Sequence, residues 1–253
     1  MVQKKWIFSV LILAVLLYGC ASNKNLPSES TSEPADINYQ KAAALNAQLA
    51  IVYTQRGMLD RAKEKLLKAK TQDDDIAEVY YAEGLYYQHL GMNNIAERAY
   101  QKALAIAPED FQACNFYARF LCDVTHQYNK AEKLYQKSVL LPDNANLAET
   151  FTLYGQCLLV QHQVKAAKGM FFRAISQGIS STYAYWELAR IEAQEGHNQA
   201  ALNMVNEYIK RVGETKENMT FKMHILQKLG RENEAVILRL RLNSGQMNRS
   251  TGY

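Results

Sequence analysis

Small and large apolar residues alternate with polar ones along the chain in a pattern that predicts pairs of amphipathic helices. The stretch 46–70 recurs in the stretch 79–108 after a shift of 34 residues. The matched pairs are Ala50 and Gly84, Tyr53 and Tyr87, Gly57 and Gly91, Ala62 and Ala96, Leu66 and Tyr100, and Ala69 and Ala103. Each unit therefore predicts a first helix, a turn at glycine and a second helix.

The same pattern continues toward the C-terminus. A small residue that marks the second helix recurs at Ala62, Ala96, Ala131, Ala167, Ala201 and Ala235. These residues predict six helix pairs across residues 39–242. The junction between the third and fourth pairs, around Pro142, needs one or two extra turn residues. Because the six pairs occupy nearly all of residues 39–242, no second folded domain is expected there.

The residue types at these positions resemble the tetratricopeptide repeat. Small side chains such as Ala50 and Ala62 would let two helices cross closely, and bulky residues would fill the space beside them. The resemblance implies an all-α fold, a right-handed superhelix of six helix-turn-helix repeats. The first helix of each repeat would line its inner wall.

The composition agrees with a folded helical protein that does not bind nucleic acid. Twelve glycines and four prolines are few for a fold with many tight turns, while 48% of residues are hydrophobic and 21% charged. The formal net charge of +4 falls to +2 if Lys4 and Lys5 are removed with a leader. Such a small net charge does not indicate the basic surface patch that nucleic-acid binding requires.

The N-terminus predicts a lipoprotein leader. Two lysines precede an apolar run over residues 6–17, which is too short to span a bilayer. The Gly19-Cys20 junction that follows resembles a bacterial lipobox, with Tyr18 as a departure from the usual small residue. Residues 1–19 would then be a signal peptide and Cys20 the lipid anchor, whereas a soluble secreted protein would keep Cys20 as a thiol. Ala21 after the cysteine favours the outer membrane.

Two polar segments flank the repeats. Residues 20–38 comprise the cysteine and a stretch rich in Ser, Asn, Glu and Pro, which predicts a flexible tether. Residues 243–253 predict a polar tail.

Each first helix also has a small marker residue, and in the first five repeats these markers are Ala50, Gly84, Ala118, Gly155 and Ala189. A partner-binding groove is expected on the first helices, at the residues three before, one after and four after each of these first-helix markers. These positions are Ala47, Ile51, Thr54, Tyr81, Leu85, Gln88, Asn115, Arg119, Cys122, Thr152, Gln156, Leu159, Trp186, Arg190 and Ala193. Ile51, Tyr81 and Leu85 form an apolar strip that could receive a helix or an extended segment. Alternatively, Tyr81 and Leu85 simply pack against neighbouring repeats.

No catalytic or metal-binding motif appears, and an open groove lacks the closed pocket that an enzyme needs. We therefore expect a non-catalytic protein with no cofactor except the lipid on Cys20, no metal and no small-molecule substrate. Trp186 and Arg190 on one helical face could stack a ligand, or they could be an ordinary packing contact.

The cysteines allow one disulfide in an oxidising compartment. Cys114 and Cys122 are eight residues apart on one helix and cannot be bridged without breaking it. Cys122 and Cys157 lie one repeat apart, at nearly the same height on adjacent first helices. We predict a bond between them with Cys114 as a buried thiol. The alternative is that all three are inert apolar residues.

A lipobox, a short tether and six repeats together resemble the PilF/PilW pilotins, the tetratricopeptide lipoproteins of type IV pilus biogenesis in Gram-negative bacteria. The resemblance is most specific in residues 44–70 and 114–123, with Phe116-Tyr117-Ala118 where the family commonly has Asn-Tyr-Gly.

The resemblance implies a monomeric lipoprotein on the periplasmic face of the outer membrane. Its partner would be a pilus secretin subunit, whose localisation and multimerisation it would promote. The alternative is a lipoprotein adaptor for outer-membrane barrel assembly or for peptidoglycan hydrolases.

Overall fold

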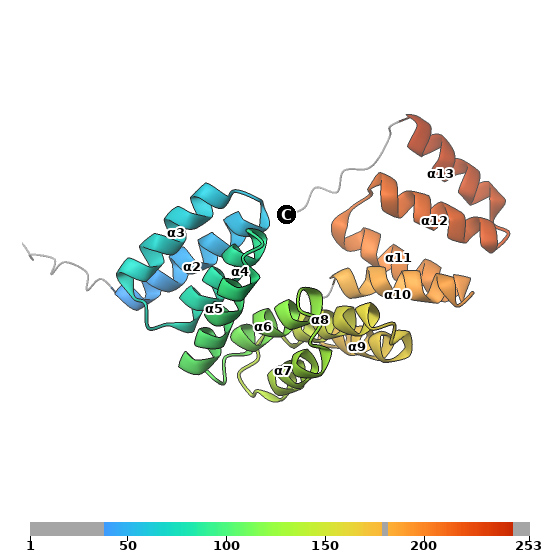
Figure 1. Cartoon of the computed structure of the whole chain (residues 1–253). Coiled ribbons are helices and arrows are strands. Elements are labelled where there is room, and N and C mark those ends of the chain that lie inside the picture. Colours follow the sequence, from blue (N-terminus) through green and yellow to red (C-terminus); the bar gives the residue numbers. More distant parts are fainter. Residues whose placement is uncertain (1–37, 179–181, 245–253) are drawn as a thin grey trace, which may run out of the picture. The chain divides into compact units, whose positions relative to one another are not determined.

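The computed structural model describes residues 38–178 and 182–244, and within these ranges every regular element is an α-helix (Figure 1). The helices are α2 (Tyr39–Gln55), α3 (Leu59–Gln72), α4 (Ala77–His89), α5 (Asn93–Ile106), α6 (Phe111–Asp123), α7 (Tyr128–Leu140), α8 (Leu147–Val160), α9 (Val164–Ser176), α10 (Thr182–Gln194), α11 (Asn198–Val212), α12 (Lys216–Lys228) and α13 (Glu232–Ser244). The predicted signal peptide, Cys20, nearly all of the tether and the end of the tail lie outside the described residues.

Consecutive helices pack in pairs, from α2 with α3 to α12 with α13, and each pair packs on the next. The first helices α2, α4, α6 and α8 also contact one another in succession. This arrangement confirms the tetratricopeptide superhelix. The first described helix begins at Tyr39, and α13 ends at Ser244. None of the described helices combines the length and the apolar character that a membrane span requires.

Small residues at the helix crossings explain the close pairing. The second-helix markers, from Ala62 to Ala235, have no exposed surface. A Cβ atom added to Gly84 in α4 would lie 2.6 Å from the Tyr100 ring of α5, and one added to Gly155 would lie 2.7 Å from Phe171. These distances are shorter than a van der Waals contact, so a side chain at either glycine would force the opposite ring to shift.

The turn inside each repeat needs a residue in the left-handed region. Gly57 and Gly91 have φ angles of 71° and 72°, which glycine adopts at little cost. The third and fourth repeats carry His126 and His162 at this place, with φ angles of 55° and 60°. The turn therefore keeps its left-handed geometry in the two described repeats that have histidine in place of glycine.

The apolar core is continuous along the array. One cluster of buried side chains fills the first two repeats, a larger one runs from the second repeat to the fifth, and a third joins the fifth to the sixth. Ile51 and Tyr87 contact both the first and the second cluster, and Met204 contacts the second and the third. Each repeat thus buries its apolar face only against its neighbours, as a solenoid requires.

The connection between the third and fourth repeats has six residues, 141–146, where the connection from α5 to α6 has four. Asn144 in this loop is buried, and its amide donates hydrogen bonds to the Ser138 carbonyl at 2.9 Å and to Thr150 Oγ1 at 3.0 Å. The extra residues that the sequence predicted are therefore held by a buried amide.

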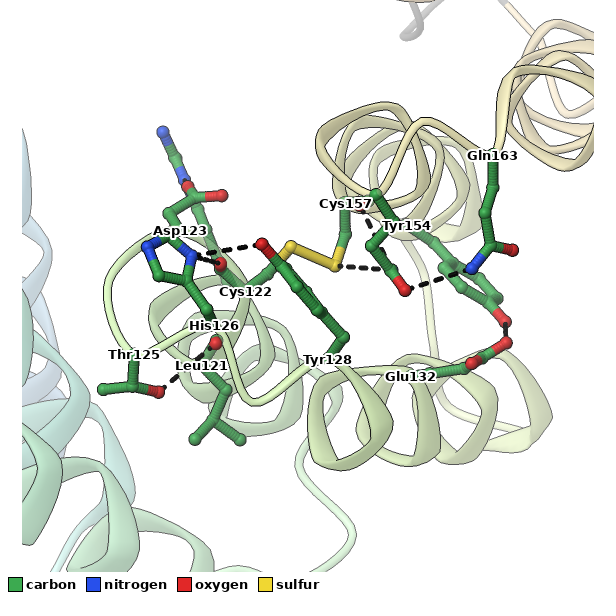
Figure 2. The surroundings of a disulfide bond; sticks show 12 residues. Leu121, Cys122, Asp123, Thr125, His126, Tyr128, Glu132, Tyr154, Cys157 and Gln163 are labelled. Atoms are coloured by element: carbon green, nitrogen blue, oxygen red, sulfur yellow. Dashed lines mark hydrogen bonds and ion pairs between the residues drawn. A yellow bond between two sulfur atoms is a disulfide. The ribbon is translucent and has the colours of Figure 1, made fainter.

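A disulfide bond joins Cys122 of α6 to Cys157 of α8, the pair that the repeat spacing selects (Figure 2). The Cα atoms are 5.8 Å apart. Tyr154, one turn before Cys157, donates a hydrogen bond to Glu132 at 2.5 Å, so the same two repeats are also linked by side chains (Figure 2). Cys114 is a buried free thiol whose pKa is raised by burial.

We expect Gly84→Ala to destabilise the protein by about 1–3 kcal/mol, because the new methyl group overfills the crossing with Tyr100. Gly169→Ala in α9 is the matched control. Its Cβ would meet no atom within 4 Å, and alanine is about 0.5–1 kcal/mol better than glycine in a helix. Urea unfolding of the two variants measures both effects. Equal stability of the two would contradict the close crossing.

We expect reduction of the Cys122–Cys157 bond to lower the free energy of unfolding by about 4 kcal/mol, because the bond closes a loop of 35 residues in the unfolded chain. Thermal unfolding with and without reductant measures this loss. The double variant Cys122→Ala, Cys157→Ala should be insensitive to reductant. An equal response of the variant and the wild type to reductant would assign the effect to something other than this bond.

Candidate partner-binding surface

Residues of α2, α4, α6 and α8, which are the first helices of repeats one to four, line a pocket of about 290 Å³. Its wall combines apolar side chains with amides and one arginine, and it carries one carboxylate. The lining residues are Gln48, Ile51, Val52 and Gln55 of α2, Tyr81 of α4, Gln112, Asn115, Phe116 and Arg119 of α6, and Glu149 and Leu153 of α8. We call this set the N-terminal pocket. It could hold one or two side chains of a bound segment, with amides available for its backbone.

Tyr81 forms the floor of the N-terminal pocket and is only 1% exposed. Its ring stacks on Phe116 with centroids 4.8 Å apart, and its hydroxyl donates a 2.7 Å hydrogen bond to Gln112 Oε1. Burial raises the pKa of Tyr81, and the nearby charges of Glu78 and Asp110 raise it further. The phenol is therefore a neutral donor that joins α4 to α6.

Asn115 also lines the N-terminal pocket and is only 5% exposed. Its amide nitrogen donates to Thr150 Oγ1 of α8 at 2.8 Å, and Thr150 also accepts from Asn144. Asn115 Oδ1 has no hydrogen-bond partner among the described residues. The polar network therefore fixes α8 against α6 beneath the pocket.

Four of the sequence-predicted groove residues line the N-terminal pocket, namely Ile51, Tyr81, Asn115 and Arg119. Arg119 is exposed and pairs with Asp123 at 3.4 Å. It also borders a second hollow of about 660 Å³ farther along the array. The predicted residues that line this second hollow are Gln156, Leu159 and Arg190.

Except for Trp186, which is described below, the other predicted groove positions are buried or packed against other parts of the protein. Ala47, Thr54, Leu85, Cys122 and Thr152 are all buried. Gln88 is half-buried and accepts a hydrogen bond from Tyr100, and Ala193 packs against the last core cluster.

The predicted apolar strip of Ile51, Tyr81 and Leu85 is therefore wrong as an open surface. Only Ile51 remains partly exposed, while Tyr81 packs on the next repeat and Leu85 is 6% exposed. The physical reason is that α4 has a first helix on each side, α2 and α6, which cover much of its inner face.

The sequence analysis missed pocket-lining residues that lie next to the predicted groove positions on the first helices. Gln48, Phe116 and Leu153 lie two residues before their small markers, and Gln112 and Glu149 lie six before. Residues six before, two before, one after and five after the marker share one helical face. This spacing could have been recognised from the markers alone.

Trp186 and Arg190 border a shallow hollow on α10 and α12, with Phe221 and His224 among its other lining residues. Trp186 packs on Tyr208 and Phe221 with centroids 5.1 Å away in each case, and Arg190 pairs with the buried Glu187 at 3.2 Å. Both side chains thus have packing partners within the protein, as the simpler interpretation expected.

Glu192, Glu195 and His197 bring their ligand atoms within 4.8 Å of one another. Lys168 already binds this group, with its ammonium 2.8 Å from Glu192 and 2.5 Å from Glu195. Partial burial opposes the charge of Lys168, but its hydrogen bonds to the two glutamates raise its pKa, and its contact lowers the pKa of Glu195. The cluster is an ion-pair network that ties α9 to α10.

Comparison with known proteins relates the chain to pilus biogenesis factors. Residues 77–110 match the family model of the tetratricopeptide repeat. The type IV pilus assembly protein PilF of Pseudomonas aeruginosa is 28% identical over 156 residues, which cover 62% of this chain. The match spans 59% of the length of PilF.

Solved structures give the same relation at the level of the fold. The crystal structure of PilW, a widely conserved type IV pilus biogenesis factor, has a TM-score of 0.66 at 22% identity and covers 81% of this chain and 95% of PilW. A solved structure of Pseudomonas aeruginosa PilF has a TM-score of 0.66 at 21% identity, and the match covers 82% of this chain and 93% of that chain. The predicted resemblance to the PilF/PilW proteins is confirmed, and these structural likenesses establish the fold.

Proposed function

We propose that this protein is a lipid-anchored pilotin, which binds a type IV pilus secretin subunit and promotes its localisation and multimerisation in the outer membrane. It acts by binding, as a scaffold for protein assembly. The similarity to PilF supports a role in pilus biogenesis, and the tetratricopeptide fold supports a role in protein–protein interaction.

The observation that carries this proposal is the N-terminal pocket. Four successive first helices contribute to it, so a bound segment would contact repeats one to four together. Ile51, Phe116 and Leu153 offer apolar contacts, while Gln48 and Gln55 offer amides at the rim. An apolar centre with a polar rim is the usual anatomy of a surface that binds a protein segment.

The proposed location rests on the sequence before the repeats. The apolar run, the Gly19-Cys20 junction and Ala21 fit a lipoprotein held at the periplasmic face of the outer membrane. A lipid on Cys20 would restrict the pocket to a thin layer beside that membrane, because only about eighteen residues separate the anchor from α2.

We expect Ile51→Lys to weaken binding of the purified secretin subunit by roughly thirtyfold, the effect of a hot-spot loss of about 2 kcal/mol. The lysine stem can follow the apolar wall while its charge would be desolvated by a bound segment. Ile51 is half-buried, so the folded array should tolerate the change better than a substitution at Leu85. Titration calorimetry measures the affinity.

Ile95→Lys on α5 is the matched control, since Ile95 is 36% exposed and lies outside the N-terminal pocket. It should bind the secretin as the wild type does, and both variants should keep the wild-type circular dichroism. Unchanged affinity in Ile51→Lys would exclude this pocket as the secretin site.

We expect Cys20→Ala to abolish incorporation of labelled palmitate in cells, because the thiol is the proposed acceptor of the lipid. The variant should move from the outer-membrane fraction to the soluble periplasm, and heat-resistant secretin multimers should become scarce. Retention of the label by the variant would contradict the proposed anchor.

A further inference from the structure

The last described helix of the array, α13, exposes large apolar side chains (Figure 1). Val236, Ile237 and Leu240 are 45%, 56% and 63% exposed. Leu240 follows the other two at intervals of four and three residues, so all three lie on one face of the helix. We call these three residues the α13 face. The terminal repeat of a solenoid normally has a polar outer face, which keeps the end of the array soluble. The α13 face departs from that rule.

In the inner repeats the same positions hold polar residues that bond to the next repeat. Val236 and Leu240 lie one and five residues after the second-helix marker. The corresponding residues are Glu97 and Gln101 in α5, and Glu132 and Gln136 in α7. The first two bond to Tyr117 of α6, and the other two bond to Tyr154 of α8. Because no helix follows α13 in the described residues, the α13 face occupies docking positions that lack a neighbour.

Two charged residues without an intramolecular partner flank the α13 face. Glu232 and Arg239 are exposed, and neither forms an ion pair within the described part of the chain, whereas the other charged residues of α13, Glu234 and Arg241, are both paired. Glu232 and Arg239 are seven residues, or about two turns, apart and therefore lie on the same edge of the helix. One edge of α13 thus carries an acidic group near its start and a basic group toward its end.

This pattern is complementary to itself. When two identical helices pack antiparallel about a two-fold axis, the same edge of each helix meets, and the start of one lies opposite the end of the other. Glu232 of one copy then lies opposite Arg239 of its partner, and the second pair forms by symmetry. Val236 lies close to the midpoint between the two charges, so the two copies of this side chain meet near the axis. Ile237 and Leu240 pack beside them.

Other occupants match the α13 face less well. Residues 245–253, which follow α13, contain no Asp or Glu and so offer no acidic side chain to Arg239. Their large apolar residues, Met247 and Tyr253, are six positions apart and do not match a helical stripe. An anionic membrane surface would repel Glu232. A second copy satisfies both unpaired charges and covers the apolar residues.

The size of the α13 face limits the strength of such a dimer. A stable interface between two proteins buries about 800 Å² on each side, which is more than one helix of 13 residues offers. The dimer should therefore be weak in solution. The proposed lipid on Cys20 would confine all copies to one membrane surface and raise their effective concentration.

We propose that α13 packs antiparallel on α13 of a second copy, with Glu232 of each copy paired to Arg239 of the other. The family resemblance implies a monomer, whereas the α13 face is built to pair with itself. This inference goes beyond the proposed function, which concerns the opposite end of the array. None of the residues of the N-terminal pocket belongs to α13, so each copy in the dimer keeps its pocket open.

Charge reversal tests the pairing. Glu232→Arg and Arg239→Glu should each weaken dimerisation of the purified protein by about tenfold or more, because each dimer loses two ion pairs. An equimolar mixture of the two variants should dimerise as the wild type does, since a mixed dimer restores opposite charges at both pairs. Lys133→Glu, which reverses an exposed charge on α7, is the matched control and should dimerise normally. Sedimentation equilibrium at up to about 0.5 mM protein measures the association.

A monomeric wild type at this concentration would overturn the proposal, as would single variants that dimerise normally or a mixture that does not. Circular dichroism should show that both variants keep the wild-type fold, because both residues are exposed. Neither variant should change binding of the secretin subunit to the N-terminal pocket, so failure of the dimer and failure of the proposed function are distinguishable.

Cysteine crosslinking tests the position of the axis. Mild oxidation with copper phenanthroline should convert Val236→Cys into a disulfide-linked homodimer, because the two copies of this residue meet at the axis. Leu140→Cys is the control, since Leu140 is 81% exposed at the end of α7 and should stay monomeric. Non-reducing gel electrophoresis separates the two species. Equal yields of dimer at both positions, or no dimer from Val236→Cys, would contradict the antiparallel pairing.

Discussion

The close crossing of the two helices inside each repeat is the constraint on which the rest of the structure depends. At Gly84 and Gly155 even one methyl group would overlap the aromatic ring of the partner helix, and the alanine markers elsewhere are fully buried. Because each crossing is so close, the apolar faces that remain must be buried against neighbouring repeats. The continuous core, the ordered row of first helices and the pocket between them all follow from this packing.

This constraint also explains why the sequence predicted the fold well and the surface less well. Small residues at a crossing leave a strong signal, so the number of repeats and the Cys122–Cys157 bond followed from spacing. The direction in which a first-helix residue points depends instead on the neighbouring helices on both sides. Leu85 and Ala47 were assigned to the groove but are buried, whereas Gln48 and Phe116 line the pocket and were missed.

In individual repeats, the residues that mark a turn elsewhere in the sequence are replaced by other residue types. His126 and His162 hold the left-handed turn position that glycine marks elsewhere, so the glycine pattern weakens where the structure does not. In the junction between the third and fourth repeats, Asn144 is a buried polar residue in a loop, and its role depends on Ser138 and Thr150. The repeat spacing does not predict the hydrogen bonds of Asn144 to Ser138 and Thr150, since the longer loop brings these residues together.

The disulfide has a consequence for the order in which parts of the array open. Solenoids unfold locally, and terminal repeats open most easily because they have one neighbour instead of two. A covalent link between α6 and α8 keeps the third and fourth repeats tethered and so disfavours their separate opening. These repeats supply six of the pocket's eleven lining residues, so the slowest-exchanging amides should lie around the pocket wall on α6 and α8, while α2, in a terminal repeat, should open more easily.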